Sequence, residues 1–150
     1  MTFIFVNTDN SDPTKKIYSG LAAGKYAAKA EEKMQKAVIR VLGKATGFTT
    51  TKSDGARGYT IRLKVAKVEI VNNKTKSSVS GYVELYPAKA TKTGIDGEEW
   101  IVPNMTGTAT ADGTDERAAI DGIESIVEDL VAKAIPPIRT DAATRGITPT

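Results

Sequence analysis

A run of alternating apolar and polar side chains over residues 59–71 limits the folds open to this chain more than any other feature. Successive side chains of a strand point to opposite faces, so the run predicts one long strand. In the first half of the run the apolar residues stand at odd positions, and in the second half they stand at even ones. They are Tyr59, Ile61, Leu63 and Val65, then Ala66, Val68 and Ile70. This change of phase predicts a β-bulge at Val65 and Ala66, which bends the strand.

The segment that follows completes a long antiparallel hairpin. Residues 72–75 are Asn-Asn-Lys-Thr, which is typical of a turn, and the two-residue period returns at Val79, Val83 and Leu85. Pro87 is expected to end the return strand, because proline has no N–H to donate to a sheet.

Three further strands are predicted over 2–6, 48–51 and 98–111. The third follows Asp96-Gly97, a favourable pair for a type I′ turn. In this strand small side chains alternate with threonines: Met105, Gly107, Ala109 and Ala111 with Thr106, Thr108 and Thr110. A face of small residues predicts that a helix packs closely on it, and the last helix of the chain is the expected cover.

The first of two amphipathic helices is predicted over 19–42, with Ser19 as N-cap and Gly43 in the left-handed position after it. Its apolar residues recur at spacings of three and four: Ala27, Ala30, Met34, Ala37, Val38 and Val41. Its other sides are basic, with five Lys or Arg and two Glu over 20–43.

The second helix is predicted over 114–135, with Thr114 as its cap and with Asp115 and Glu116 at the positive end of its dipole. Its core stripe is equally regular: Ile120, Ile123, Val127, Leu130 and Ala134, widened by Ile126 and Val131. Pro136-Pro137 is expected to end this helix, because proline clashes with the preceding turn and cannot donate a hydrogen bond.

Together these elements predict an α+β domain with the order β-α-(β)-β-β-β-α. Four or five strands form a mostly antiparallel sheet around the long hairpin, and both helices pack on one face of it. Residues 1–150 are expected to form a single domain. Its parts are an N-terminal strand and arm over 1–18, the α+β core over 19–135, and an extended C-terminal arm over 136–150.

The chain contains neither cysteine nor histidine. It therefore has no disulfide, no thiolate nucleophile, no imidazole base and none of the commonest zinc ligands. We expect no catalytic residues, no metal site and no cofactor, and hence a protein that is not an enzyme. A Ser–Lys pair is an arrangement that the composition leaves open.

Three local patterns approach a known kind of site without meeting its requirements. The glycine-rich stretch 54–58 lacks phosphate-loop spacing and precedes a strand rather than a helix. Glu98 and Glu99 are neighbours in a strand and point to opposite faces, which disfavours a carboxylate pair for sugar hydrolysis. Tyr82 and Tyr86 share one face of a strand, but a net charge of +3 and few aromatic residues disfavour nucleic-acid binding.

Charge is divided unevenly between the two helices, since 114–135 holds two basic and six acidic residues. Such halves can pair within one chain or between subunits, and pairing between subunits would join copies head to tail. The candidate interface residues come from the first helix, the hairpin and the C-terminal arm: Lys29, Lys33, Lys36, Tyr82, Tyr86, Ile138 and Ile147.

The sequence gives little indication of a membrane or an export route. No apolar run approaches the roughly 20 residues of a spanning helix. The first six residues have no basic region of the kind that opens a signal peptide, and no lipobox cysteine is present. We therefore expect a cytoplasmic or virion-associated protein, unless the sequence is that of a processed form.

The order of elements has a counterpart among known proteins. A helix ending at Gly47-Phe48 leads through Ala56-Arg57-Gly58-Tyr59 into a long strand, and an Asn-Lys-Thr turn and a final helix entered at 117–120 follow. Over about residues 20–135 this order resembles the small domains of two bacterial envelope families, the curli-secretion lipoproteins (CsgG) and the penicillin-binding-protein activators (LpoB). The resemblance implies a non-enzymatic assembly or partner-binding role. Small phage tail and head-completion proteins use similar arrangements.

Two functions therefore remain under consideration. The first is a non-enzymatic structural subunit of a virion, filament or envelope assembly, which self-associates through its hairpin and terminal arms. The alternative is a monomeric accessory module of the bacterial envelope that binds one protein partner. Both predict another protein, or a second copy, as the partner.

Overall fold

The computed structural model describes most of the chain. The described residues are 3–10, 17–19, 27–52, 56–86, 89–91, 94–96 and 100–147. The strands are β1 (Ile4–Asn7), β2 (Tyr18–Ser19), β3 (Phe48–Thr49), β4 (Gly58–Val71), β5 (Lys74–Tyr86), β6 (Lys89–Thr91), β7 (Gly94–Asp96) and β8 (Trp100–Asp112). The helices are α1 (Ala27–Lys44) and α2 (Glu116–Thr144).

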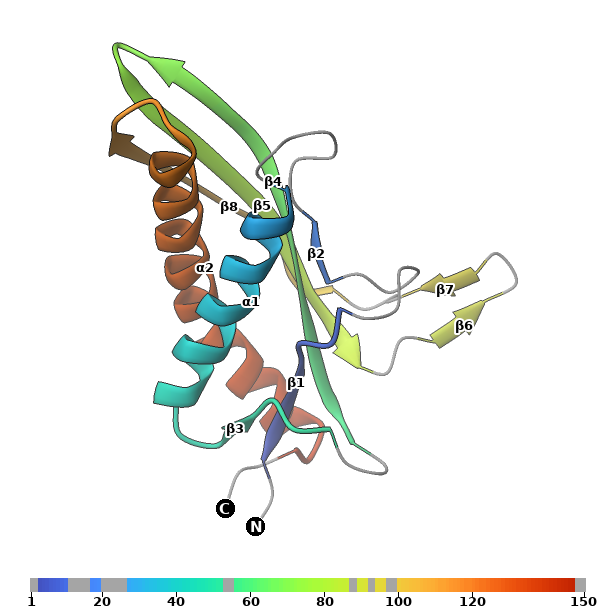
Figure 1. Cartoon of the computed structure of the whole chain (residues 1–150). Coiled ribbons are helices and arrows are strands. Elements are labelled where there is room, and N and C mark those ends of the chain that lie inside the picture. Colours follow the sequence, from blue (N-terminus) through green and yellow to red (C-terminus); the bar gives the residue numbers. More distant parts are fainter. Residues whose placement is uncertain are drawn as a thin grey trace.

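The predicted α+β fold class is confirmed. The large sheet has the order β3-β1-β4-β5-β8, with β2 also paired to β4, and β6 pairs with β7 separately. Figure 1 shows α1 and α2 side by side on one face of this sheet, while β6 and β7 extend away from it.

The large sheet is mixed, which corrects the mostly antiparallel sheet expected from the sequence. β1 lies parallel to both β3 and β4, and β2 lies parallel to β4. The β4–β5 and β5–β8 pairs are antiparallel. Tight turns are the sequence signal for antiparallel pairing. No such turn joins β1 to either neighbour, so its direction left no local trace in the sequence.

The hairpin of β4 and β5 is confirmed with its bulge. Their register shifts between Val65 and Lys67, which leaves Ala66 without a cross-strand partner at the position where the apolar phase changes. The turn consists of Asn72 and Asn73, with φ of 53° and 61°. Two positive φ values are what a type I′ turn requires, and asparagine tolerates them better than most residues.

Helix α1 buries most of the alanine-rich stripe predicted for it, and Val41 is partly buried. The side chains at most 1% exposed are Ala30, Met34, Ala37, Val38 and Leu42. The predicted helix start is wrong, because Ser19 belongs to β2, and residues 20–26 lie outside the described part. Gly43 lies within the helix, and the left-handed residue is Gly47, with φ of 89°.

The N-cap of helix α2 is Asp115, one residue after the predicted cap Thr114, and the helix begins at Glu116. The carboxylate of Asp115 accepts a hydrogen bond from the amide of Ala118 at 3.0 Å, which satisfies one of the free N–H groups of the first turn. The predicted core stripe is buried: Ile120, Ile123, Ile126, Val127, Leu130, Val131 and Ala134.

Helix α2 continues through Pro136 and Pro137 to Thr144, so both the predicted helix end and the extended arm over 136–150 are wrong. The prolines remove two backbone hydrogen bonds, and Figure 1 shows α2 bending in its C-terminal part. Buried side chains hold the continuation in place: Ile138 and Ala142, both 0% exposed, and Ile147, 5% exposed. Burial of this apolar face outweighs the local preference of proline.

Polar contacts fix the same segment to the sheet. The hydroxyl of Tyr59 donates to the carboxylate of Asp141 at 2.6 Å, and Asp141 also accepts from Nε of Arg145 at 2.8 Å. Burial, and then the hydrogen bond to Asp141, raise the pKa of Tyr59. The guanidinium of Arg139 lies 4.8 Å from the centre of the Phe48 ring. The end of α2 is therefore part of the folded core.

The predicted close packing of α2 on β8 is confirmed. Met105 is buried on the side facing α2, whereas the threonines of β8 are exposed on the other side. A Cβ added to Gly107 would lie 2.6 Å from Cγ2 of Ile126, closer than carbon atoms can approach. The small residues of β8 thus set how near α2 lies.

Candidate functional site

The face of the large sheet opposite α1 and α2 carries no helix of the described residues (Figure 1). We call it the outer face. Strand register places its side chains in rows: Phe5 and Tyr86, then Thr60, Glu84 and Trp100, then Arg62 and Tyr82, then Lys64, Ser80 and Thr106. Aromatic and charged side chains therefore gather where β4, β5 and the start of β8 meet.

The beginning of β8 is irregular, and this irregularity shapes the site. Its register with β5 shifts twice between Met105 and Trp100. Pro103 lies in this stretch and cannot donate to a ladder, and Asn104 has a φ of 55°. Bulges redirect the side chains beside them. Here the irregular stretch brings Trp100 next to Tyr82.

Trp100 and Tyr82 form an aromatic pair on the outer face. Their ring centroids lie 5.2 Å apart and their planes are inclined by 34°. Trp100 nevertheless remains 58% exposed, although an indole is costly to leave in water. The two packed rings form an apolar surface that is exposed to solvent on one side, and we call this surface the aromatic wall.

A buried ion pair lies beside the aromatic pair. Nε of Arg62 donates to the carboxylate of Glu84, whose residue is only 3% exposed. Removing Arg62 would leave the buried carboxylate of Glu84 without this partner, and an unpaired buried charge typically costs about 3–5 kcal/mol. The pair therefore fixes β4 against β5 beside Tyr82, the cross-strand partner of Arg62.

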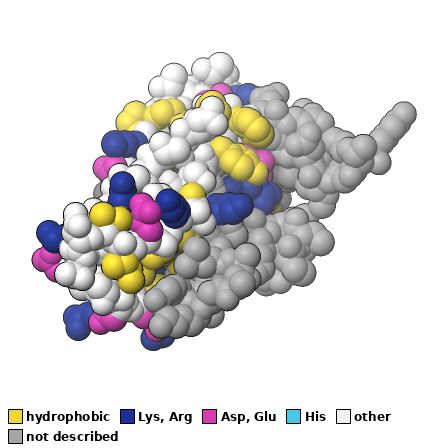
Figure 2. Space-filling view, turned by 90° about the horizontal axis from the view of Figure 1, so that it is seen from above, with side chains coloured by type: hydrophobic (Ala, Val, Ile, Leu, Met, Phe, Trp, Pro, Cys, Tyr) yellow, Lys and Arg dark blue, Asp and Glu magenta, His cyan; other side chains and the backbone are white. Residues whose placement is uncertain are grey.

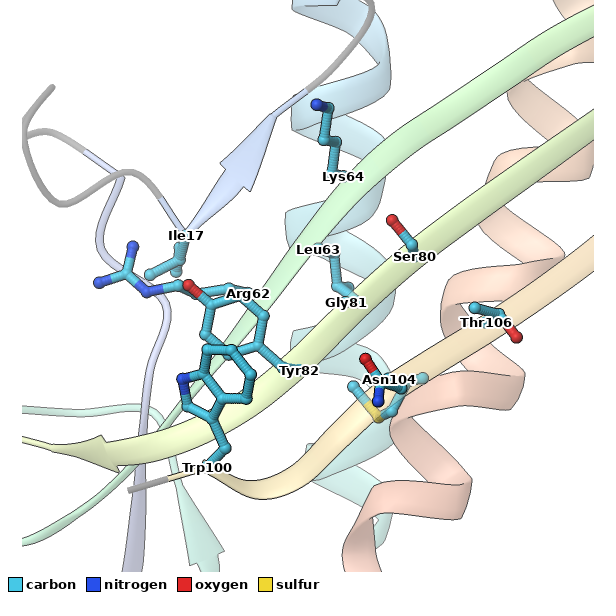
Figure 3. Close-up of a pocket in the computed structure, with 11 residues that line it drawn as sticks. Ile17, Arg62, Leu63, Lys64, Ser80, Gly81, Tyr82, Trp100, Asn104 and Thr106 are labelled. Carbon is cyan, nitrogen blue, oxygen red and sulfur yellow. The ribbon is translucent and has the colours of Figure 1, made fainter. Parts of the chain in front are cut away.

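A hollow of about 440 Å³ lies next to the aromatic wall, and we call it the Trp100 hollow. Figure 3 shows Trp100 and Tyr82 at one side of it, with Lys64 and Ser80 toward the other. Its apolar lining includes Leu63 and Met105, and its polar lining includes Lys64, Ser80, Asn104 and Thr106. No aspartate or glutamate is among the described residues that line it.

Gly81, which borders the hollow, allows β5 to lie close to β4. A Cβ added there would lie 2.3 Å from the carbonyl oxygen of Arg62 and 2.7 Å from Cδ2 of Leu63. Any side chain at this position would push β5 away from β4, so only glycine fits.

Among the described residues, the Trp100 hollow contains no hydrogen-bonded Ser–Lys pair. Lys64 and Ser80 are direct cross-strand partners, which is the Ser–Lys neighbourhood that the composition left open. No hydrogen bond joins them among the described residues, and Lys64 is exposed, whereas a lysine that acts as a base is held away from water. Among the described residues no cluster of carboxylates could hold a metal ion. Within the same residues no helix is long and apolar enough to cross a membrane.

The charges of the two helices pair within the chain. Arg40 of α1 contacts both Glu124 and Glu128 of α2, and Lys29 lies 3.8 Å from Glu116. Figure 2 shows basic and acidic side chains interspersed on the visible face rather than gathered in separate patches. The charge split therefore gives little support to a head-to-tail contact between copies.

The seven predicted interface residues do not form one surface. Lys29, Lys33 and Lys36 are exposed on α1, where Lys36 pairs with Glu32 at 2.8 Å. Tyr82 and Tyr86 lie on the outer face, and Tyr82 borders the Trp100 hollow.

Two of these seven residues are buried in the folded chain. The structure places Ile138 and Ile147 in the core beneath the sheet, at 0% and 5% exposure, so their proposed role as an exposed apolar contact is wrong. They belonged to the segment taken for an extended arm, which is helical up to Thr144.

Trp100, the Arg62–Glu84 pair and Asn104 were not identified from the sequence as site residues. Pro103 was the available signal, because a proline inside a predicted strand indicates a bulge or an edge. Glu98 and Glu99, which the sequence disfavours as a catalytic carboxylate pair, lie outside the described residues.

No family model matches this chain, and no curated protein matches it. Among solved structures, a Xanthomonas campestris protein of the DUF330 family is similar at 8% identity, with a TM-score of 0.56, over 95% of this chain and 88% of that one. This similarity shows a shared fold.

Two other structures are similar with TM-scores below 0.5. A candidate lipoprotein from Caulobacter crescentus has 17% identity and a TM-score of 0.46, over 84% of this chain and 90% of its own. A PelC variant from Paraburkholderia phytofirmans, solved as a dodecamer, has 15% identity and a TM-score of 0.45, over 91% and 86%.

Proposed function

We propose that this chain is a non-enzymatic subunit of an assembly, and that two copies join by pairing their β8 strands edge to edge. The main observation that supports this proposal is the unpaired outer edge of β8 among the described residues. This strand ends the order β3-β1-β4-β5-β8, and no other described strand pairs with its outer side.

The composition of β8 supports a paired edge. It is 13 residues long, and from Trp100 to Ala111 it contains no charged side chain. Exposed edges usually carry lysines, prolines or bulges that prevent pairing. In β8 these features are confined to Pro103 and the irregular stretch around it, so residues 105–111 offer a regular and uncharged edge.

The turn of the hairpin determines which peptide groups of β8 point outward. A two-residue turn at 72–73 is closed by Val71 and Lys74 as a hydrogen-bonded pair. The bonding direction alternates along β5, so Thr75 bonds toward β8, where its partner is Ala111. Alternate residues of β8 therefore direct their N–H and C=O groups to the free edge: Thr106, Thr108 and Thr110.

Pairing of β8 with β8 of a second copy favours a closed dimer. Two identical strands pair antiparallel about a two-fold axis, which uses the same surface on both subunits. The opposite sheet edge is β3, only two residues long, and it offers little for an open chain of subunits.

Three observations support a role without catalysis. The chain has no cysteine and no histidine, the described residues contain no cluster of metal ligands, and the Ser80–Lys64 neighbourhood lacks a hydrogen bond. The alternative function, a monomeric module that binds a protein partner, would use the same edge for a strand of that partner.

Thr108→Pro tests this proposal, with Thr108→Ala as its matched control. Proline removes the outward N–H, whereas alanine removes only the side chain, and neither change touches the ladder between β8 and β5. We expect sedimentation velocity to give about twice the 15.9 kDa monomer mass for the wild type and the alanine variant, and the monomer mass for the proline variant. Thr110→Pro provides a second variant, and circular dichroism confirms that each one folds.

A wild type that stays monomeric at millimolar concentration would contradict self-association. A proline variant that dimerises as well as its alanine control would show that copies meet elsewhere.

A further inference from the structure

Among the described residues, one cation that lines the Trp100 hollow has no ion-pair partner. Arg62 and Lys64 line it, but the charge of Arg62 is compensated by Glu84. Lys64 has no ion pair among the described residues, and none of the described residues that line the hollow is a carboxylate. A ligand that brings a negative charge next to Lys64 would therefore gain a charge-assisted hydrogen bond.

Apolar surface lies within the same hollow. Trp100 and Tyr82 form one side, and Leu63 and Met105 contribute further apolar lining. Pockets that bind specifically combine an apolar lining with a few fixed polar groups, and here Ser80 and Asn104 provide those groups.

The aromatic wall is held in position before any ligand arrives. Trp100 packs against Tyr82, and the buried pair of Arg62 and Glu84 fixes the strands beneath. A site that is already ordered loses less entropy when it binds, so more of its contact energy appears as affinity.

We propose that the Trp100 hollow binds a segment of a partner protein in which a large apolar side chain adjoins an aspartate or glutamate. The apolar side chain packs against Trp100, and the carboxylate pairs with Lys64. This surface lies on the face of the sheet and shares only Thr106 with the edge of β8 that is proposed to join two copies.

Two other ligand classes fit less well. Binding a nucleic-acid strand requires several cations along its backbone, and the described lining of the hollow supplies one uncompensated cation, Lys64. Sites for small molecules enclose most of their ligand, whereas Trp100, at 58% exposure, stands open to solvent. A protein segment covers such an open surface while the rest of the partner remains outside.

Trp100 is the only tryptophan of the chain, so its fluorescence reports directly on the hollow. The probe is the blocked hexapeptide Gly-Gly-Leu-Asp-Gly-Gly, titrated into the wild type and into the Thr108→Pro variant. We expect a saturable change in emission with both proteins. If the emission of the Thr108→Pro variant also changes, peptide binding does not depend on self-association. Peptides with Lys for Asp, or with Ala for Leu, are expected to bind several-fold more weakly.

Lys64→Ala is the decisive variant, and Lys76→Ala, on the outer face but away from the hollow, is its control. We expect Lys64→Ala to weaken binding of the Leu-Asp peptide about two- to five-fold, with a smaller difference at high salt, and Lys76→Ala to leave it unchanged. Equal binding of the Leu-Asp and Leu-Lys peptides, or no emission change at millimolar peptide, would overturn the proposal. Tighter binding of a single-stranded oligonucleotide than of the peptide would overturn it in favour of nucleic acid.

Discussion

Replacing Ile138 by alanine removes three carbon atoms from the part of α2 that follows the two prolines. Ile138 is 0% exposed and belongs to the same apolar cluster as the hairpin and the rest of α2. If this segment is part of the core, the substitution must leave a cavity there. If the segment is an arm, the substitution removes nothing that folding depends on.

The expected magnitude follows from the buried carbon atoms. At about 0.8 kcal/mol per buried CH₂ the transfer loss is about 2.4 kcal/mol, and the cavity raises the loss in unfolding free energy to about 3–4 kcal/mol. For a chain of 150 residues, this corresponds to a fall in melting temperature of about 6–15 °C. Ile138→Val should cost only about 0.5–1.5 kcal/mol.

Urea unfolding followed by far-ultraviolet circular dichroism measures this loss. Ala143→Ser is the matched control, because Ala143 is exposed in the same segment and should change stability by less than about 0.5 kcal/mol. A loss for Ile138→Ala no larger than that of the control would refute the packing described for residues 136–147.

Three further predictions concern the contacts that hold the fold. Tyr59→Phe removes the hydrogen bond to Asp141 and should cost about 1–2 kcal/mol in the same urea experiment; an unchanged midpoint would contradict the contact. Because folding raises the pKa of Tyr59, the wild type should keep its full stability below about pH 10 and lose stability as the pH rises further, and Tyr59→Phe should reduce that loss. Gly107→Ala places a Cβ against Ile126 and should cost about 1–3 kcal/mol by thermal unfolding, whereas a neutral result would mean that α2 lies farther from β8.

Features of the fold that repeat regularly along a whole strand could be predicted from the sequence. The phase change at Val65 and Ala66 located the bulge, because a strand that buries one face must restore its apolar side after an extra residue. The small residues of β8 predicted the close approach of α2 for a similar reason. In both cases many side chains in one element depend on the same face being buried.

The end of α2 could not be predicted because a local rule and a tertiary effect disagree there. Pro136 and Pro137 normally end a helix, and the sequence beyond them shows no clear period. The helix continues because Ile138 and Ala142 meet the core and Asp141 meets Tyr59, 82 residues earlier in the chain. Such contacts between distant positions leave no local pattern.

The Trp100 hollow was missed for the same physical reason. Trp100 and Tyr82 are 18 residues apart in the sequence, and their contact depends on two register shifts in β8. The pairing of Arg62 with Glu84 likewise depends on the register of the hairpin. Tyr82 was identified from its strand face alone, without the residues that surround it.

Amide hydrogen exchange along β8 tests the proposed assembly most directly, because it reads the free edge residue by residue. In dilute protein, the amides of Gly107, Ala109 and Ala111 should be protected by β5, whereas those of Thr106, Thr108 and Thr110 should exchange rapidly. At concentrations where sedimentation shows the dimer, the three threonine amides should become protected as well. If they exchange equally fast at both concentrations while the dimer forms, the copies do not meet through β8.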